Sequence, residues 1–237
     1  MPQIWQLSAN YRGVTATGTC NGFPVMKADT GESGESGFTT MPLNPVLIGK
    51  GNVLRIEVTQ KSDDAEFNCS VEDAMTGDII DTGNAAKIEL PEGDPPHVIE
   101  IKFDSPQDLF AGLLAKAEPA DEKSVVDYAI KLRDMLNGKD VDGLMKAFTP
   151  KFEDMSKAFE QPLEMMMQQA RGMIEAFCSA RHEFEAADVN AIPCCDNKLW
   201  ELKNKEGEPL IQVKEEDGVM RMDACVARLP DGIAIVR

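Results

Sequence analysis

The side chains with the clearest chemical potential are a pair of adjacent cysteines and the residues that precede them. Cys194-Cys195-Asp196 follows Cys178 and His182, which are four residues apart and would share one face of a helix. Thiolates and imidazoles are the usual ligands of structural zinc, which takes four in a tetrahedron. Adjacent cysteines rarely direct both sulfurs at one metal, and no CxxC spacing occurs. Three interpretations stay open: a zinc site, a disulfide among these residues, and buried or free thiols.

The two histidines are the next candidates. His182 and His97 are the only two, so a His-based triad has few possible members, and His182 could form an acid/base pair with Glu183, Glu185 or Asp223. A histidine near a helix end often serves instead as a cap or surface residue. No GxSxG, HExxH, Walker A, GxGxxG or EF-hand pattern occurs. We assign no catalytic residue, no cofactor and no metal, and expect a protein that is not an enzyme.

Methionines gather in one segment, at Met165-Met166-Met167 with Met155 and Met173 nearby. Thioethers suit a copper site or a pliable apolar groove. Because Met166, Met167 and Met173 fall on the predicted core stripe of a helix, we expect core packing, with a peptide or apolar-ligand pocket as the alternative.

The remaining cysteines and two acidic turns have ordinary interpretations. Cys20 and Cys69 fall on the apolar phase of predicted strands, which favours two core thiols over a cross-sheet disulfide. We interpret all six thiols, including Cys225, as reduced and the protein as cytoplasmic; removal of a signal peptide would make it periplasmic. The acidic turns Asp63–Glu66 and Glu215–Gly218 could touch calcium, but solvated hairpin loops are expected.

Charge and hydropathy exclude several classes of protein. The 237 residues include 24 Lys and Arg against 41 Asp and Glu, a net charge of −17, which argues against binding to nucleic-acid phosphates. No apolar run approaches the ~20 residues that cross a bilayer, and the start of the chain lacks the basic and apolar regions of a secretory signal.

The first part of the chain shows the two-residue alternation of strands. Apolar residues alternate over 5–11 and again over 14–20, where Asn21-Gly22 predicts a type I′ hairpin turn and a return strand at 23–27. A flexible acidic loop is expected at 28–37. Further alternation occurs at 53–58, 67–72 and 98–103. Six or more short strands predict an all-β antiparallel sandwich.

Helical periodicity begins after Ser105-Pro106, the expected cap and first turn of a helix ending near Lys116. A helix over 125–136, ended by Asn137-Gly138, precedes a short helix at 141–148. Thr149-Pro150 predicts a restart, and Gln161-Pro162 opens the longest helix, which continues to Phe177. Strands are then expected at 199–203, 210–214, 220–226 and 233–237. Helices followed by strands indicate an α+β domain.

Two resemblances to known families follow from these segments. Asn44, Leu47, Gly51 and Asn52, leading into the strand at 53–58, resemble a segment of galactose-binding-like β-sandwiches, as does the hairpin around Asn21-Gly22. The resemblance implies that Gly51-Asn52 turns into a core strand and that Leu47 plugs one end of the sandwich. Such sandwiches bind sugars in some families and serve as scaffolds in others.

The second resemblance covers about residues 120–237. The helix, turn and short helix of Tyr128–Leu144, with closing strands at Gly207–Ile211 and Asp231–Ile235, are similar to nuclear transport factor 2-like domains, which form a cystatin-like α+β cone. Enzymes of this fold place Asp, His or Tyr inside a conical pocket. No motif transfers those catalytic residues to numbered positions of this chain.

Together these patterns predict two domains: an antiparallel β-sandwich over 1–105, a helical connector over 106–120 and an α+β cone over 121–237. The expected function is that of a bacterial-type, non-catalytic binding or interaction protein, with a small-ligand pocket lined by the Met-rich helix, Trp200 and Met222. One alternative is a lyase, isomerase or hydrolase that uses the cone. Another is an envelope-associated carbohydrate or partner binder that uses the sandwich. The partner is a protein or small molecule, and a homo-oligomer is compatible with the sequence.

Overall fold

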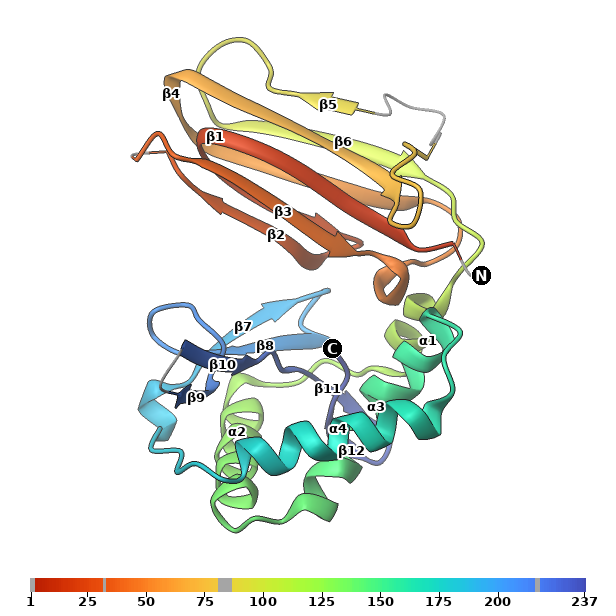
Figure 1. The fold of residues 1–237 in the computed structure, drawn as a ribbon, viewed down its shortest axis with the longest axis vertical. Helices are drawn as coiled ribbons and strands as arrows, with labels where there is room; N and C mark the ends of the chain where they lie inside the picture. The colour runs from red at the N-terminus through yellow and green to blue at the C-terminus, as the bar shows by residue number, and fades with distance from the viewer. Residues whose placement is uncertain (1–2, 32, 81–86, 216–217) are drawn as a thin grey trace. The chain divides into compact units, whose positions relative to one another are not determined.

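A computed structural model of the chain describes residues 3–31, 33–80, 87–215 and 218–237. The described chain is rich in strands, and its four α-helices follow the first sheet (Figure 1). It divides into two compact units, Met1–Gly112 and Leu113–Arg237. The prediction of a β-rich, two-part fold with helices in the later part is confirmed. The sandwich and the cone remain predictions.

The first unit contains one six-stranded antiparallel sheet. Its strands are β1 (Trp5–Cys20), β2 (Phe23–Asp29), β3 (Ser36–Pro42), β4 (Asn52–Asp73), β5 (Lys87–Glu89) and β6 (His97–Phe103). The long strands β1 and β4 pair with each other. β2 and β3 pair with successive parts of β1, and β6 and β5 pair with successive parts of β4. Two long strands therefore organise the whole unit.

The long strand β1 contains an irregularity in its pairing with β4 at Gly13. Arg12 pairs with Glu66 and Val14 with Lys61, so Gly13 alone stands opposite residues 62–65 of β4. Gly13 has a φ of 59°, and a Cβ there would overlap the Ser62 side chain. The three extra residues therefore lie in β4, and across Gly13 the buried positions of β1 change from odd to even numbers, so the apolar face stays inward. The expected short strands are wrong here, and Asp63–Glu66 lies inside β4 instead of forming a hairpin loop.

The turn from β1 to β2 is as predicted, but the segment after β2 is not. Asn21 and Gly22 have φ values of 53° and 80°, and Cys20 pairs with Phe23 across them. The expected loop at 28–37 is shorter, because β2 continues to Asp29 and the unpredicted strand β3 begins at Ser36. The acidic turn at Glu215–Gly218 includes residues 216–217, which lie outside the described residues.

Buried asparagine side chains connect the loops of the first unit to its strands. Asn52 is fully buried; its Oδ1 accepts from the Ile48 amide at 2.8 Å and from Asn21 Nδ2 at 2.9 Å. Its Nδ2 donates to the carbonyls of Gly49 at 2.8 Å and Phe103 at 3.2 Å. The expected turn into a core strand at Gly51-Asn52 is present, with a φ of 71° at Gly51.

Helices α1 (Leu109–Lys116), α2 (Glu122–Asn137), α3 (Val141–Ala158) and α4 (Leu163–Phe177) follow the first sheet. α1 begins later than expected, because Ser105 Oγ donates to the carbonyls of Gly49 and Gln107 and does not cap a helix. α2 ends at the predicted residue, and Asp121 caps its start by accepting from the Ser124 amide at 2.9 Å.

The expected restart at Thr149-Pro150 is wrong, because α3 continues through Pro150. Thr149 Oγ1 donates to the Met145 carbonyl at 2.9 Å, a side-chain bond within the helix instead of a new cap. Buried Leu144, Phe148 and Phe152 recur every four residues across the proline. Packing of this continuous apolar stripe compensates for the backbone hydrogen bond that Pro150 cannot donate.

Two small sheets complete the second unit. Their strands are β7 (Asn190–Cys194), β8 (Leu199–Lys203), β9 (Ile211–Glu215), β10 (Gly218–Met222), β11 (Cys225–Leu229) and β12 (Gly232–Ile235). The order β12-β11-β8-β7 forms one sheet, and β9 and β10 form the other. β7 was not predicted, and the expected strand at 220–226 is divided between β10 and β11.

The helices α2 to α4 and one face of the larger sheet share a hydrophobic core. Leu132, Phe148 and Ile174 from the helices pack in the same cluster as Trp200 and Val226 from the strands. No helix among the described residues is long and apolar enough to cross a membrane.

Candidate functional site

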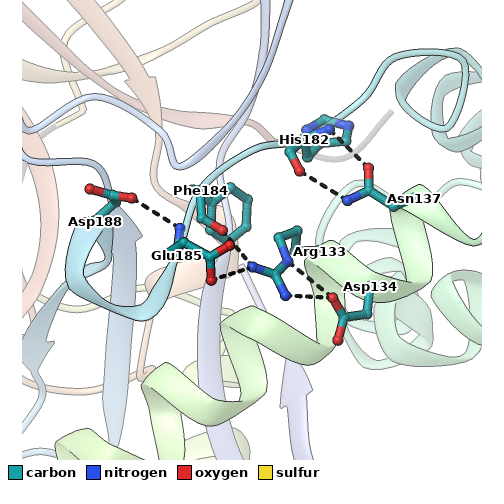
Figure 2. A network of polar contacts seen from close by, with 7 residues as sticks. All are labelled: Arg133, Asp134, Asn137, His182, Phe184, Glu185 and Asp188. Atoms are coloured by element: carbon teal, nitrogen blue, oxygen red, sulfur yellow. Dashed lines mark hydrogen bonds and ion pairs between the residues drawn. The ribbon is translucent and has the colours of Figure 1, made fainter.

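The segment that follows α4 is clamped onto α2, and His182 lies within this clamp (Figure 2). Asn137 Nδ2 donates to the His182 carbonyl at 2.9 Å, and the His182 amide donates to Asn137 Oδ1 at the same distance. The His182 ring is buried, with Nε2 3.0 Å from the Phe177 carbonyl. Because a carbonyl only accepts, Nε2 carries the proton in this bond.

One turn earlier on α2, Arg133 completes the clamp. Its Nη1 donates to the Phe184 carbonyl at 2.8 Å and lies 2.8 Å from Glu185 Oε2, while its Nη2 lies 2.8 Å from Asp134 Oδ1. Hydrogen bonds to Asp134 and then Glu185 raise the pKa of Arg133. The Glu185 amide donates to Asp188 Oδ2 at 3.0 Å, which lowers the pKa of that carboxyl. These contacts fix the backbone of residues 182–188.

None of the described carboxylates proposed as acid/base partners of His182 is hydrogen-bonded to it. Glu183 pairs with Arg181 at 3.2 Å, Glu185 pairs with Arg133, and Asp223 pairs with Lys203 at 3.2 Å. Within the described ranges no hydrogen bond joins His182 to a carboxylate. The contacts of His182 therefore position the backbone of the segment after α4, and the candidate acid/base pair does not form.

The cysteines do not assemble a metal site. Cys178 caps α4, whereas Cys194 ends β7 and Cys195 begins the turn to β8 with a φ of 51°. In the part of the chain that the structure describes, no three His, Cys, Asp or Glu side chains converge as metal ligands. The thiol of Cys194 interacts with the thiols of Cys195 and Cys225. The hydrogen bond with Cys195 lowers the pKa of Cys194, but the bond with Cys225 and burial outweigh it and raise that pKa. The hydrogen bond with Cys194 and burial raise the pKa of Cys195.

All six cysteines lie among the described residues, and none forms a disulfide. Cys20 and Cys69 are at most 1% exposed, which confirms that both are core residues of the first unit. Burial raises the pKa of Cys69 to about 12. Protonated thiols at neutral pH are poor nucleophiles and poor metal ligands.

Three residues that were expected to line a ligand pocket in the second unit are buried. Met166, Trp200 and Met222, which were expected to line it, are at most 8% exposed and belong to the packed core. A depression of about 470 Å³ is lined by other residues, Asn204, Glu206, Glu208, Gln212 and Lys214. Its lining is polar, and Glu208 is already paired with Arg221 at 3.0 Å.

The methionines of α4 divide between core and surface. Met166 is buried as predicted, but Met173 is 38% exposed and Met165 is 44% exposed. The placement of Met173 on the core stripe is therefore wrong. It lies beside the buried stripe of Met166, Ala170 and Ile174 and not within it.

The strongest candidate for a recognition surface is one that was not identified from the sequence, the outer edge of β3 in the first unit. β3 has no charged residue, and its Phe38 is 60% exposed, the highest value among the exposed large hydrophobic residues. Among the described strands it pairs only with β1, which leaves its other edge open. The run Phe38-Thr39-Thr40-Met41 favours a strand by residue type and was the available signal.

Comparison with known proteins finds no matching family model, no similar curated protein and no similar solved structure. The two family resemblances therefore stay predictions.

Proposed function

We propose that this chain is a non-catalytic interaction protein that recognises a protein partner by strand pairing at the open edge of β3. The observation that carries the proposal is an uncharged seven-residue edge strand with an exposed aromatic side chain. An open edge presents unpaired backbone donors and acceptors, which another extended strand can satisfy. Main-chain bonds would supply affinity, and Phe38 would supply specificity.

The other edges of the same sheet support this choice by contrast. β2 carries Pro24 and Lys27, and β6 carries Glu100 and Lys102. Prolines and charges are the devices by which proteins protect sheet edges from unwanted pairing. β3 has no charge and has proline only at its last position, so pairing is tolerated or used there.

The second unit supports a non-catalytic role. His182 Nε2 and the Asn137 side-chain amide are engaged with backbone groups, and Met166, Trp200 and Met222, which were expected to line a ligand pocket, are buried in the core cluster. We read this unit as the α+β cone of a nuclear transport factor 2-like scaffold and the bulged first sheet as a sandwich. Helices packed on one sheet face support the first assignment, and the register shift at Gly13 supports the second.

A photo-crosslinking phenylalanine derivative placed at Phe38 in the full chain, in its native cells, tests the proposal. We expect a covalent adduct of defined mass from this position. The same derivative at Val98, which is 49% exposed on the charged edge strand β6, is the matched control and should give little adduct. Equal yields at both positions, or no adduct at Phe38, would contradict strand pairing at β3.

A further inference from the structure

We infer that the partner strand at this edge is β3 of a second copy of the chain, paired antiparallel about a two-fold axis at Thr39. The inference rests on the proposed function and adds the identity of the partner and the register. Three observations support it: which backbone groups of β3 point away from β1, the absence of charged residues from β3, and the match between these outward groups and those of a second, antiparallel β3.

The phase of β3 follows from one backbone bond. The Leu43 amide donates to the Trp5 carbonyl at 2.7 Å, which makes Trp5 and Leu43 a hydrogen-bonded pair. Such pairs alternate along an antiparallel ladder. The following inward pairs are Leu7–Met41, Ala9–Thr39 and Tyr11–Gly37. The backbone groups of Ser36, Phe38, Thr40 and Pro42 therefore point away from β1, and proline occupies an outward position where no donor to β1 is needed.

This phase makes the edge complementary to itself. With the axis at Thr39, Phe38 stands opposite Thr40 of the second copy, and Ser36 stands opposite Pro42 of the second copy. Every outward N–H of β3 then faces a carbonyl, and the missing proline donor falls at the end of the ladder. The exposed Phe38 ring would cover Thr40 of the other strand, an aromatic and β-branched pair that stabilises sheets.

The charges around the strand fit a second copy. Glu35, the acidic residue next to β3, would stand opposite Leu43 of the copy and not opposite another acid. Neutral strands meet without like-charge pairs, so repulsion arises only from the net charge of −17 on each chain. Salt screens charges separated by more than ~8 to 10 Å. A dimer built this way should strengthen with salt, whereas a complex with a basic partner should weaken.

The test is analytical ultracentrifugation of the purified full chain over a range of protein and sodium chloride concentrations. We expect a reversible monomer–dimer equilibrium that shifts towards dimer as salt rises. Thr40→Pro removes an outward N–H that does not bond to β1. Because the dimer has two-fold symmetry, one inter-strand hydrogen bond is lost from each copy. This loss should raise the dissociation constant by about tenfold or more. Thr40→Val retains the N–H and is the matched control, with a change of less than about threefold.

Thr40→Lys is a second variant, because it places on β3 the type of charge that protects β2 and β6 and requires no change of backbone. It should also weaken the dimer, and unchanged Trp5 fluorescence should show that the first unit stays folded. A chain that is monomeric under all conditions, or a dimer that neither Thr40→Pro nor Thr40→Lys weakens, would overturn the inference. A monomer that still crosslinks from Phe38 to another protein in cells would overturn self-pairing alone and leave the proposed function standing.

Discussion

The two units bury different kinds of polar side chain. In the first unit the buried polar residues of the described chain are Ser8, Asn44 and Asn52, all neutral, whereas in the second they are His182 and Arg237, which can carry charge. Neutral amides satisfy backbone groups without a desolvated charge, but a buried cation needs a partner. The first unit is therefore expected to depend on hydrogen-bond geometry, and the second on charge pairing and pH.

Each unit contains one of the two tryptophans, Trp5 and Trp200, so the comparison can be measured unit by unit in the full chain. Trp5 stacks on Phe103 with ring centroids 5.6 Å apart, and Trp200 Nε1 donates to the Asn197 carbonyl at 3.1 Å. The Trp200→Phe background reports on the first unit, and the Trp5→Phe background reports on the second.

The largest effect is expected from Asn52→Ala. The change removes the bonds that Asn52 makes to Ile48, Gly49 and Phe103, so that the Ile48 amide and the buried Phe103 carbonyl lose these side-chain partners. We expect a loss of about 3 to 4 kcal/mol in the free energy of unfolding of the first unit. Urea unfolding followed by Trp5 fluorescence measures it. Asn10→Ala, at an exposed position on β1, is the control and should change stability by less than about 0.5 kcal/mol.

Asp154→Ala should have the next largest effect, in the second unit. Arg237 Nη1 lies 3.0 Å from Asp154 Oδ2, and the side chains are 6% and 21% exposed. Burial lowers the pKa of Arg237, and Asp154 opposes that shift. Removing the carboxylate leaves a buried cation, at a cost of about 2 to 3 kcal/mol by Trp200 fluorescence. Adding Arg237→Met should recover most of the loss; a double variant as unstable as the single one would show that the charge is not responsible.

Asn137→Ala should cost about 1 to 2 kcal/mol, because it deletes both bonds to the His182 backbone. Amide hydrogen exchange should quicken around His182 while the interior of α3 stays protected. Asn190→Ala, on the exposed side of β7, is the control. Unchanged exchange at residues 182–185 would mean that Arg133 alone holds the segment.

The smallest effect concerns Lys151, whose Nζ donates to the Asp223 carbonyl at 3.2 Å. Burial lowers the pKa of Lys151 from 10.5, so the folded chain releases this proton at a lower pH than the unfolded chain does. Between the two pKa values the unfolded state binds more protons, and stability rises with pH. Lys151→Met should stabilise the second unit by less than about 1 kcal/mol at neutral pH. The difference from the parent protein should shrink towards pH 10.5 in parallel urea titrations; a constant difference would contradict the assignment.

Features set by neighbouring residues were predictable from the sequence. The Asn21-Gly22 turn, the end of α2 at Asn137 and the strand β8 (Leu199–Lys203) all match, because turn chemistry and periodicity act over a few residues. The continuity of β1 was not predictable, since the strand runs through Gly13 only because β4 pairs with it on both sides of that residue.

The remaining predictions failed because the structure there depends on contacts between residues that are distant in the sequence. Thr149-Pro150 suggested a new helix start, yet packing carries α3 through Pro150. The strand β7, which was not predicted, forms by pairing with β8. The importance of β3 depends on which edge is left unpaired, and the role of His182 depends on Asn137, 45 residues earlier in the chain. Neither relationship is visible in local residue patterns.

The shared use of β1 and β4 has a consequence for the order in which the first unit can form during synthesis. The β1–β2 hairpin can close as soon as its residues leave the ribosome, but Trp5 must wait for its partner Asp73 at the far end of β4. Contacts of large sequence separation form slowly because the intervening loop must be closed first. In the meantime β1, β2 and β3 form a growing sheet that lacks its central neighbour. The first unit should therefore gain its cooperative stability late, in a single step, when β4 is complete.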